Sequence, residues 1–149
     1  NNFLPFIFII LLFLQLIIGA FVSGMDAGKI YNSWPLMGTS YFPNDSTMLN
    51  LFSLTVFNDP SLVQFIHRNL AYLILGFYLI ILFKIYLNEM NEYFKIIGLI
   101  GFFLFFQILL GILTLLSGAQ IFLSSVHQIS SIFLISLTIF FLYLNTKTN

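Results

Sequence analysis

Apolar residues form four long blocks along the chain, separated by stretches that are richer in polar residues. A helix needs about 20 predominantly apolar residues to cross the hydrocarbon core of a bilayer, and each block reaches that length. Short connections join the second block to the third and the third to the fourth, which favours antiparallel helical hairpins. The pattern predicts an all-α fold: a polytopic membrane four-helix bundle made of two similar hairpins. The expected spans are residues 4–23, 62–87, 95–117 and 123–144.

The stretch between the first two spans, residues 25–61, is longer than a loop without its own structure usually is. It is not hydrophilic: Trp34 and several Tyr, Phe and Pro residues precede an apolar run over residues 48–57. Aromatic residues of this kind suit the membrane interface. We expect an interfacial loop that acts as a lid; the alternative is an interfacial anchor without a chemical role.

Composition supports a membrane protein in contact with the lipid bilayer. Of 149 residues, 60% are hydrophobic and only 7% are charged, against about 25% charged in soluble domains. Five Lys/Arg balance five Asp/Glu, so no basic stripe is available for nucleic acid. The chain has no Cys, which excludes disulfides, thiolate metal sites and cysteine nucleophiles.

The chain starts at Asn1 without the basic flank and cleavage site of a signal peptide. We therefore expect residues 1–149, a single transmembrane domain, to be a mature product or, in preference, a piece of a longer protein. The side of the bundle with the turn between the second and third spans carries three Lys/Arg, and the opposite side two. This weak excess places the first side in the cytoplasm or matrix.

An internal repeat relates the two hairpins. Residues 13–19 read FLQLIIG and residues 105–111 read FFQILLG, so a Gln and a Gly recur four residues apart. The helix that follows each of them carries one histidine, His67 or His127, near the same side of the membrane. Corresponding spans run in the same direction, which makes this a parallel repeat with its axis along the membrane normal.

The two histidines are the candidate metal ligands. Each lies about five residues inside its expected span, or roughly 7–8 Å at 1.5 Å per residue, so their depths match. One neutral His from each of two helices supplies both axial positions of a heme iron, whereas zinc needs three or four ligands. Small residues leave clearance for a flat macrocycle. These are Gly19, Ala71, Gly111, Ser130 and Ser131.

Two cations lie near the same side of the membrane, Arg68 beside His67 and Lys29 in the long loop. Either is a candidate partner for heme propionates. Other interpretations stay open at this point: the histidines as interhelical hydrogen-bonding residues or a proton relay, the two glutamines as interhelical contacts, and Arg68 as a snorkelling side chain. We expect Tyr72 and Tyr78 to face lipid or the core.

Three segments resemble one known family. Residues 19–37, GAFVSGMDAGKIYNSWPLM, are similar to the loop signature of the heme A synthase family. Residues 63–68, VQFIHR, resemble its Gln-Phe-x-His-Arg element, and residues 126–128, VHQ, its later Leu-His-Gln. Order, spacing and the four-helix layout agree over essentially the whole chain.

The resemblance implies an oxidoreductase that converts heme O to heme A by oxidising a porphyrin methyl group, for terminal oxidase assembly. Members have eight spans in two similar halves, and this chain resembles the C-terminal half, which holds heme b through two histidines, here His67 and His127. The substrate-heme pocket, a second His pair and an important glutamate belong to the N-terminal half. They have no counterpart here, because Glu89 and Glu92 lie on the wrong side. The resemblance assigns no catalytic residue to this chain and does not imply activity of this chain alone.

The resemblance further implies partners and a location. The partners are heme O through the N-terminal half, heme O synthase and an electron donor such as a ferredoxin; a homo-oligomer is an open alternative. The location is a bacterial or mitochondrial inner membrane, with the heme near the periplasmic or intermembrane-space side. Two other functions remain: a non-enzymatic membrane b-type cytochrome that carries electrons, and a small transporter bundle without a chromophore.

Overall fold

The computed structural model describes residues 3–147 and contains four long helices. All four are long and apolar enough to cross a membrane, and their bounds lie within three residues of the expected ones. The prediction of an all-α, four-span membrane protein is therefore confirmed; residues 1–2 and 148–149 of the expected domain lie outside the described residues. The long helices are α1 (Phe3–Gly24), α2 (Pro60–Leu87), α3 (Phe94–Leu116) and α4 (Ile121–Lys147), and the short 3-10 helices are η1 (Ala27–Lys29), η2 (Met48–Phe52), η3 (Leu54–Asn58) and η4 (Asn91–Tyr93).

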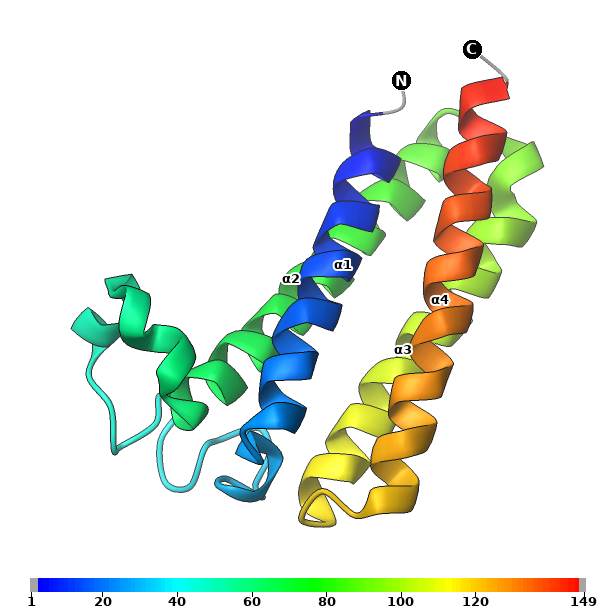
Figure 1. Cartoon of the computed structure of the whole chain (residues 1–149). Coiled ribbons are helices and arrows are strands. Elements are labelled where there is room, and N and C mark those ends of the chain that lie inside the picture. Colours follow the sequence, from blue (N-terminus) through cyan, green and yellow to red (C-terminus); the bar gives the residue numbers. More distant parts are fainter. Residues whose placement is uncertain (1–2, 148–149) are drawn as a thin grey trace.

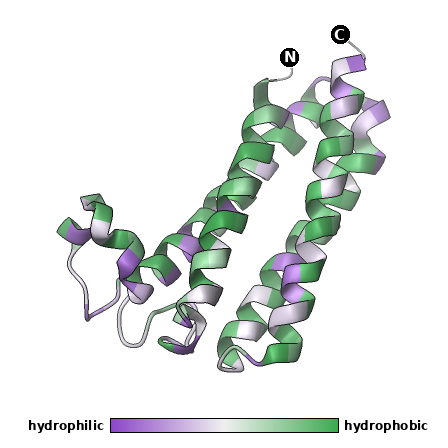
Figure 2. Cartoon of the chain, in the orientation of Figure 1, coloured by the Kyte–Doolittle hydropathy of each residue, from purple (hydrophilic) through white to green (hydrophobic). Residues whose placement is uncertain are grey.

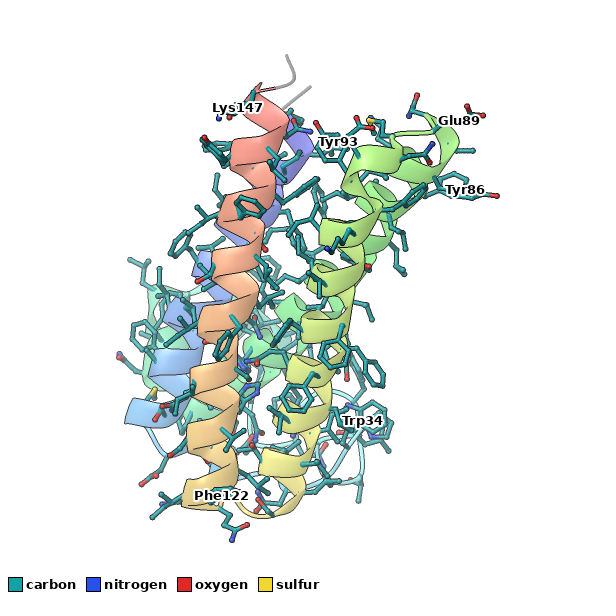
Figure 3. The ribbon with its side chains drawn as sticks, turned by 90° about the vertical axis from the view of Figure 1, so that its right-hand side faces the viewer. Trp34, Tyr86, Glu89, Tyr93, Phe122 and Lys147 are labelled. Carbon is teal, nitrogen blue, oxygen red and sulfur yellow. The ribbon has the colours of Figure 1, made fainter. Side chains whose placement is uncertain are left out.

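The helices form two hairpins, α1 with α2 and α3 with α4 (Figure 1). The start of α1, the end of α4 and the 88–93 connection lie at one end of the bundle, which we call the terminal end (Figure 1). The long 25–59 loop and the 117–120 turn lie at the other, which we call the loop end. Figure 3 shows Glu89 and Lys147 at the terminal end and Trp34 at the loop end.

Local sequence signals fix where the helices start and turn. Asp59 caps α2, because its side chain accepts hydrogen bonds from the backbone N–H groups of Ser61 (2.9 Å) and Leu62 (3.2 Å). Pro60 occupies the first turn, where its missing N–H costs nothing. After α3, Gly118 adopts φ 70°, a left-handed conformation that ends helices and favours glycine.

The large buried apolar cluster lies in the terminal-end half of the bundle. It draws on the first half of α1, the second half of α2, the first half of α3 and the second half of α4. Tyr78 belongs to it, as expected, and its hydroxyl donates to the carbonyl of Ile97 at 3.1 Å. A Cβ at Gly101 would overlap this hydroxyl, so glycine is what lets the tyrosine lie against α3. Other apolar side chains of the helices are exposed, as lipid contact requires, and most of the length of the helices is coloured as hydrophobic in Figure 2.

The outer part of the long loop projects sideways from the start of α2, away from α3 and α4 (Figure 1). Its apolar residues are exposed: Leu49 by 82%, Phe52 by 89% and Leu54 by 93%. Phe57 anchors this part, since its ring packs on Phe21 of α1 with centroids 5.4 Å apart. An interfacial position for the loop agrees with this exposure and stays a prediction.

Candidate functional site

The two histidines lie at matched depth near the loop end. His67 is the eighth residue of α2 and His127 the seventh of α4, which places both about 10 Å from the helix starts at 1.5 Å per residue. Both side chains are partly buried. The structure thus places the two expected ligands at one level of the bundle.

His67 is contacted by the Gln and Gly of α1. The side-chain nitrogen of Gln15 donates to the backbone carbonyl of His67 at 3.1 Å and lies 3.3 Å from ring atom Nε2. A Cβ at Gly19 would lie 3.2 Å from ring atom Cε1, which is tighter than most Cβ contacts. Gln15 and Gly19 are four residues apart, so they occupy the same face of α1 on successive turns.

His127 is contacted in the same way by α3. The side-chain nitrogen of Gln107 donates to the backbone carbonyl of His127 at 2.9 Å, and a Cβ at Gly111 would lie 3.1 Å from ring atom Cε1. Ser130 adds a contact that the first hairpin lacks, because its hydroxyl donates to the side-chain oxygen of Gln107. The glutamines are therefore interhelical contacts, as one interpretation of the sequence held. The missing side chains of Gly19 and Gly111 make room for the imidazole rings, and clearance for a macrocycle stays a prediction.

The surroundings of the two histidines fit a prosthetic group that itself supplies most of the ligands of its metal ion. Nδ1 of His67 and Nδ1 of His127 are buried without a hydrogen-bond partner among the described residues. Within residues 3–147 no group of three or more His, Cys, Asp or Glu side chains could hold a bare metal ion. A heme iron needs only two axial ligands from the protein, because the porphyrin supplies four. The buried apolar cluster also stops short of this half of the bundle.

Arg68 binds the long loop. Its guanidinium donates to the backbone carbonyls of Ser33 (2.9 Å), Leu36 (3.3 Å) and Tyr31 (2.9 Å). Gln64, which is buried, also donates to the carbonyl of Tyr31 at 3.1 Å. The Gln and Arg of the VQFIHR segment therefore hold residues 31–36 against α2. The contacts of Arg68 with the loop are observed, whereas a contact with a heme propionate stays a prediction.

Lys29 lies at the surface of the loop. It forms an ion pair with Asp26 at 2.8 Å, and both side chains are more than half exposed, at 57% and 73%. Exposed pairs of this kind contribute little to stability. A role for Lys29 toward a propionate likewise stays a prediction.

Side chains of the loop also bond to one another and to the start of α2. Tyr31 donates to Asp45 at 3.0 Å, and Ser61 donates to the other oxygen of Asp45 at 2.7 Å. Ser46 donates to Asp59 at 2.7 Å. Burial, followed by the hydrogen bond to Asp45, raises the pKa of Tyr31 above its usual 10.0. The phenol therefore remains a donor at neutral pH.

Sequence reasoning missed two anchors of the loop. Asn32 donates to the carbonyl of Leu115 at 2.9 Å, which joins the loop to the end of α3 in the second hairpin. Trp34 donates to the hydroxyl of Tyr72 at 2.9 Å, so Tyr72 holds the loop in addition to facing outward. Asn32 and Trp34 lie inside the signature segment of residues 19–37, but nothing in their spacing identifies a partner.

Comparison with known proteins gives consistent matches. The COX15-CtaA family model, described as cytochrome oxidase assembly protein, matches residues 2–139. The heme A synthase of Pelagibacter ubique (strain HTCC1062) is 47% identical over 147 residues, which cover 99% of this chain and 43% of that protein. Those of Rickettsia felis and Wolbachia pipientis wMel are 40% and 38% identical, over 91% and 95% of this chain and 41% and 39% of theirs. The chain thus spans less than half the length of these relatives. No solved structure matches it significantly.

Proposed function

The chain belongs to the COX15-CtaA family of cytochrome oxidase assembly proteins, and from that membership we propose that it is the half of a heme A synthase that binds heme b. His67 and His127 are the proposed axial ligands of the heme iron. The complete protein is proposed to oxidise a methyl group of heme O to give heme A.

One observation carries the heme assignment: two histidines from α2 and α4 lie at matched depth, each with a buried ring nitrogen that lacks a partner among the described residues. A buried polar atom without a partner is costly, which favours a ligand at that position. Two imidazoles complete the coordination of a heme iron and of few other metal centres. The same end of the bundle lacks the apolar cluster that fills the other half.

When bound, the heme supplies one-electron redox chemistry. The chain supplies the rest of the site. α2 and α4 present the two imidazoles, α1 and α3 contact them through Gln15 and Gln107, and Arg68 keeps the 31–36 segment over the start of α2. Arg68 and Lys29 are proposed to meet the propionates, and the loop to limit access of water.

Substrate, partners and sidedness are proposed for the complete protein. Heme O and heme A are proposed to bind to the other half of the complete protein. The proposed partners are an electron donor such as a ferredoxin, and heme O synthase, which acts one step earlier. The loop end is proposed to face the periplasm or intermembrane space. The four spans and the relatives support a membrane protein; the inner membrane of a bacterium or mitochondrion is the proposed location.

Absorption spectroscopy of the purified chain in lipid nanodiscs tests the heme assignment. We expect the spectrum of a six-coordinate, low-spin heme, lost in His67→Ala and in His127→Ala. Tyr86→Ala and Tyr143→Ala are matched controls, because they remove exposed rings from the other end of the same helices. A spectrum that survives both histidine substitutions contradicts the proposal, as does a wild-type chain without a chromophore, which a transporter bundle would give.

Co-expression with heme O synthase and the N-terminal half of a relative tests the enzymatic assignment. We expect extracted pigment to contain heme A only when both halves are present. A b-type cytochrome that merely carries electrons would bind heme without producing heme A. Such carriers usually hold hemes near both membrane faces, whereas both histidines here lie near the loop end.

A further inference from the structure

We infer that Gln15 with Gly19, and Gln107 with Gly111, are positioning residues that fix the height and the rotation of the two imidazoles. We call each pair, together with the histidine it contacts, a Gln-Gly clasp. The inference rests on the proposed function, because the positioned rings are the proposed iron ligands.

The glutamine of each clasp fixes the height of the histidine. Its amide donates to the backbone carbonyl of His67 at 3.1 Å or of His127 at 2.9 Å. A histidine carbonyl displaced by part of a turn would leave the amide without this acceptor in an apolar environment, where an unmet hydrogen bond is costly. The bond therefore opposes sliding of the histidine-bearing helix along its neighbour.

The glycine of each clasp fixes the rotation of the ring. The nearest ring atom, Cε1, would lie 3.2 Å from a Cβ at Gly19 and 3.1 Å from a Cβ at Gly111. Any larger residue forces the ring to shift by a few tenths of an ångström. The rotation of two axial imidazoles relative to each other sets the ligand field at the iron, so a shift of this size changes a measurable property of the metal.

The two clasps are not equivalent. In the second, Ser130 donates to the oxygen of Gln107 and orients the amide. In the first, Leu70 occupies the matching position three residues after the histidine, and the oxygen of Gln15 is buried without a partner among the described residues. Gln15 instead reaches the ring of His67 itself, at 3.3 Å. We therefore expect substitution of Gln15 to disturb the ring directly, and substitution of Gln107 to act through the helix.

Glycine substitutions provide the sharpest test, because the chain contains matched controls. Gly19→Ala and Gly111→Ala add a methyl group against an imidazole. Gly76→Ala and Gly98→Ala add the same group within α2 and α3, where nothing lies within 4 Å. All four changes raise helix propensity equally, so a difference between the pairs reports the ring contact.

The readouts are electron paramagnetic resonance of the ferric heme and the rate of heme release from the purified chain in nanodiscs. For Gly19→Ala and Gly111→Ala we expect heme to remain bound, with shifted g values and release accelerated about tenfold or more, as for an overpacked contact. The control variants should match the wild type. Wild-type g values and release rates in all four variants overturn the inference.

A second measurement does not depend on heme. Solid-state NMR of ¹⁵N-histidine-labelled chain in membranes should show that Gly19→Ala shifts only the His67 resonances and Gly111→Ala only those of His127. Gln15→Met should shift His67 as well, whereas the exposed Gln120→Met should shift neither. If wild-type chain binds no heme, the proposed function fails while these resonances still decide on the clasps; unchanged resonances in the glycine and Gln15 variants overturn them.

Discussion

Replacing Arg68 by Ala is expected to release the 31–36 segment from α2. The guanidinium makes three hydrogen bonds to loop carbonyls, at 2.9, 2.9 and 3.3 Å. A hydrogen bond to a charged group contributes about 1.5–3 kcal/mol. The longest of the three is exposed, and ordering the long side chain costs entropy. We therefore expect Arg68→Ala to weaken the attachment of residues 31–36 to α2 by about 2–4 kcal/mol.

Hydrogen exchange measured by mass spectrometry detects this loss. Local opening governs exchange of the amides in a folded segment, so 2–4 kcal/mol corresponds to roughly 30- to 1,000-fold faster exchange. The amides of Met37 and Gly38 are suitable probes, because they donate to Ser40 O at 2.7 Å and Ser33 Oγ at 2.8 Å. Exchange in the transmembrane helices should stay unchanged.

Two further variants test whether faster exchange comes from the lost hydrogen bonds of Arg68 or from the lost positive charge. Arg68→Lys keeps the charge but has one ammonium group in place of the planar fork, so we expect an intermediate effect. Lys29→Ala removes a cation from the same loop whose pair with Asp26 is exposed, and it should alter exchange by less than about fivefold. Unchanged exchange of the probe amides in Arg68→Ala would refute the reasoning. Loss of heme with an intact loop would instead assign Arg68 to the propionates alone.

Three more predictions concern the fold. Gly101→Ala should lower the free energy of unfolding by about 1–3 kcal/mol through overlap with the Tyr78 hydroxyl, measured by denaturation in detergent, while Gly98→Ala should not lower it. Asp59→Ala should cost about 1 kcal/mol by removing the cap of α2; the same measurement on Asp59→Asn, which keeps an acceptor, should show a smaller loss. The raised pKa of Tyr31 means that the folded loop binds its phenol proton more tightly than the unfolded chain does. Its contribution is complete below pH 10 and is lost as pH rises through the raised pKa. The late-titrating part of the tyrosinate absorbance should be smaller by one tyrosine in Tyr31→Phe than in the wild type, and an unchanged late amplitude in that variant would contradict the assignment.

The helices and their hairpins follow from the sequence because their causes are local. Bilayer thickness sets the length of an apolar span, so the four blocks give helix bounds within three residues of the observed ones. Asp59 and Pro60 signal the start of α2 through capping chemistry that involves only neighbouring residues. Matched histidine depth follows in the same way, because helical rise converts a count of residues into a distance.

The contacts of the loop could not be predicted from the sequence. The position of Arg68 in the sequence is typical of a cation at the membrane interface. Its partners are nevertheless the carbonyls of residues 31, 33 and 36, more than 30 positions away. Tyr72 resembles other outward-facing aromatics, yet it accepts a hydrogen bond from Trp34. A loop of this length has many ways to cross the bundle end, and no periodicity selects among them.

The amino-acid sequence by itself therefore determined four membrane spans, their antiparallel pairing, and a repeat that brings one histidine of each hairpin to the same depth. Only the tertiary structure decided that Gly19 and Gly111 make room for the imidazoles, and that Arg68 and Asn32 tie the loop to both hairpins. The physical reason is range: hydrophobic periodicity and capping act over a few residues, whereas a side chain's partner across helices depends on how the whole bundle packs.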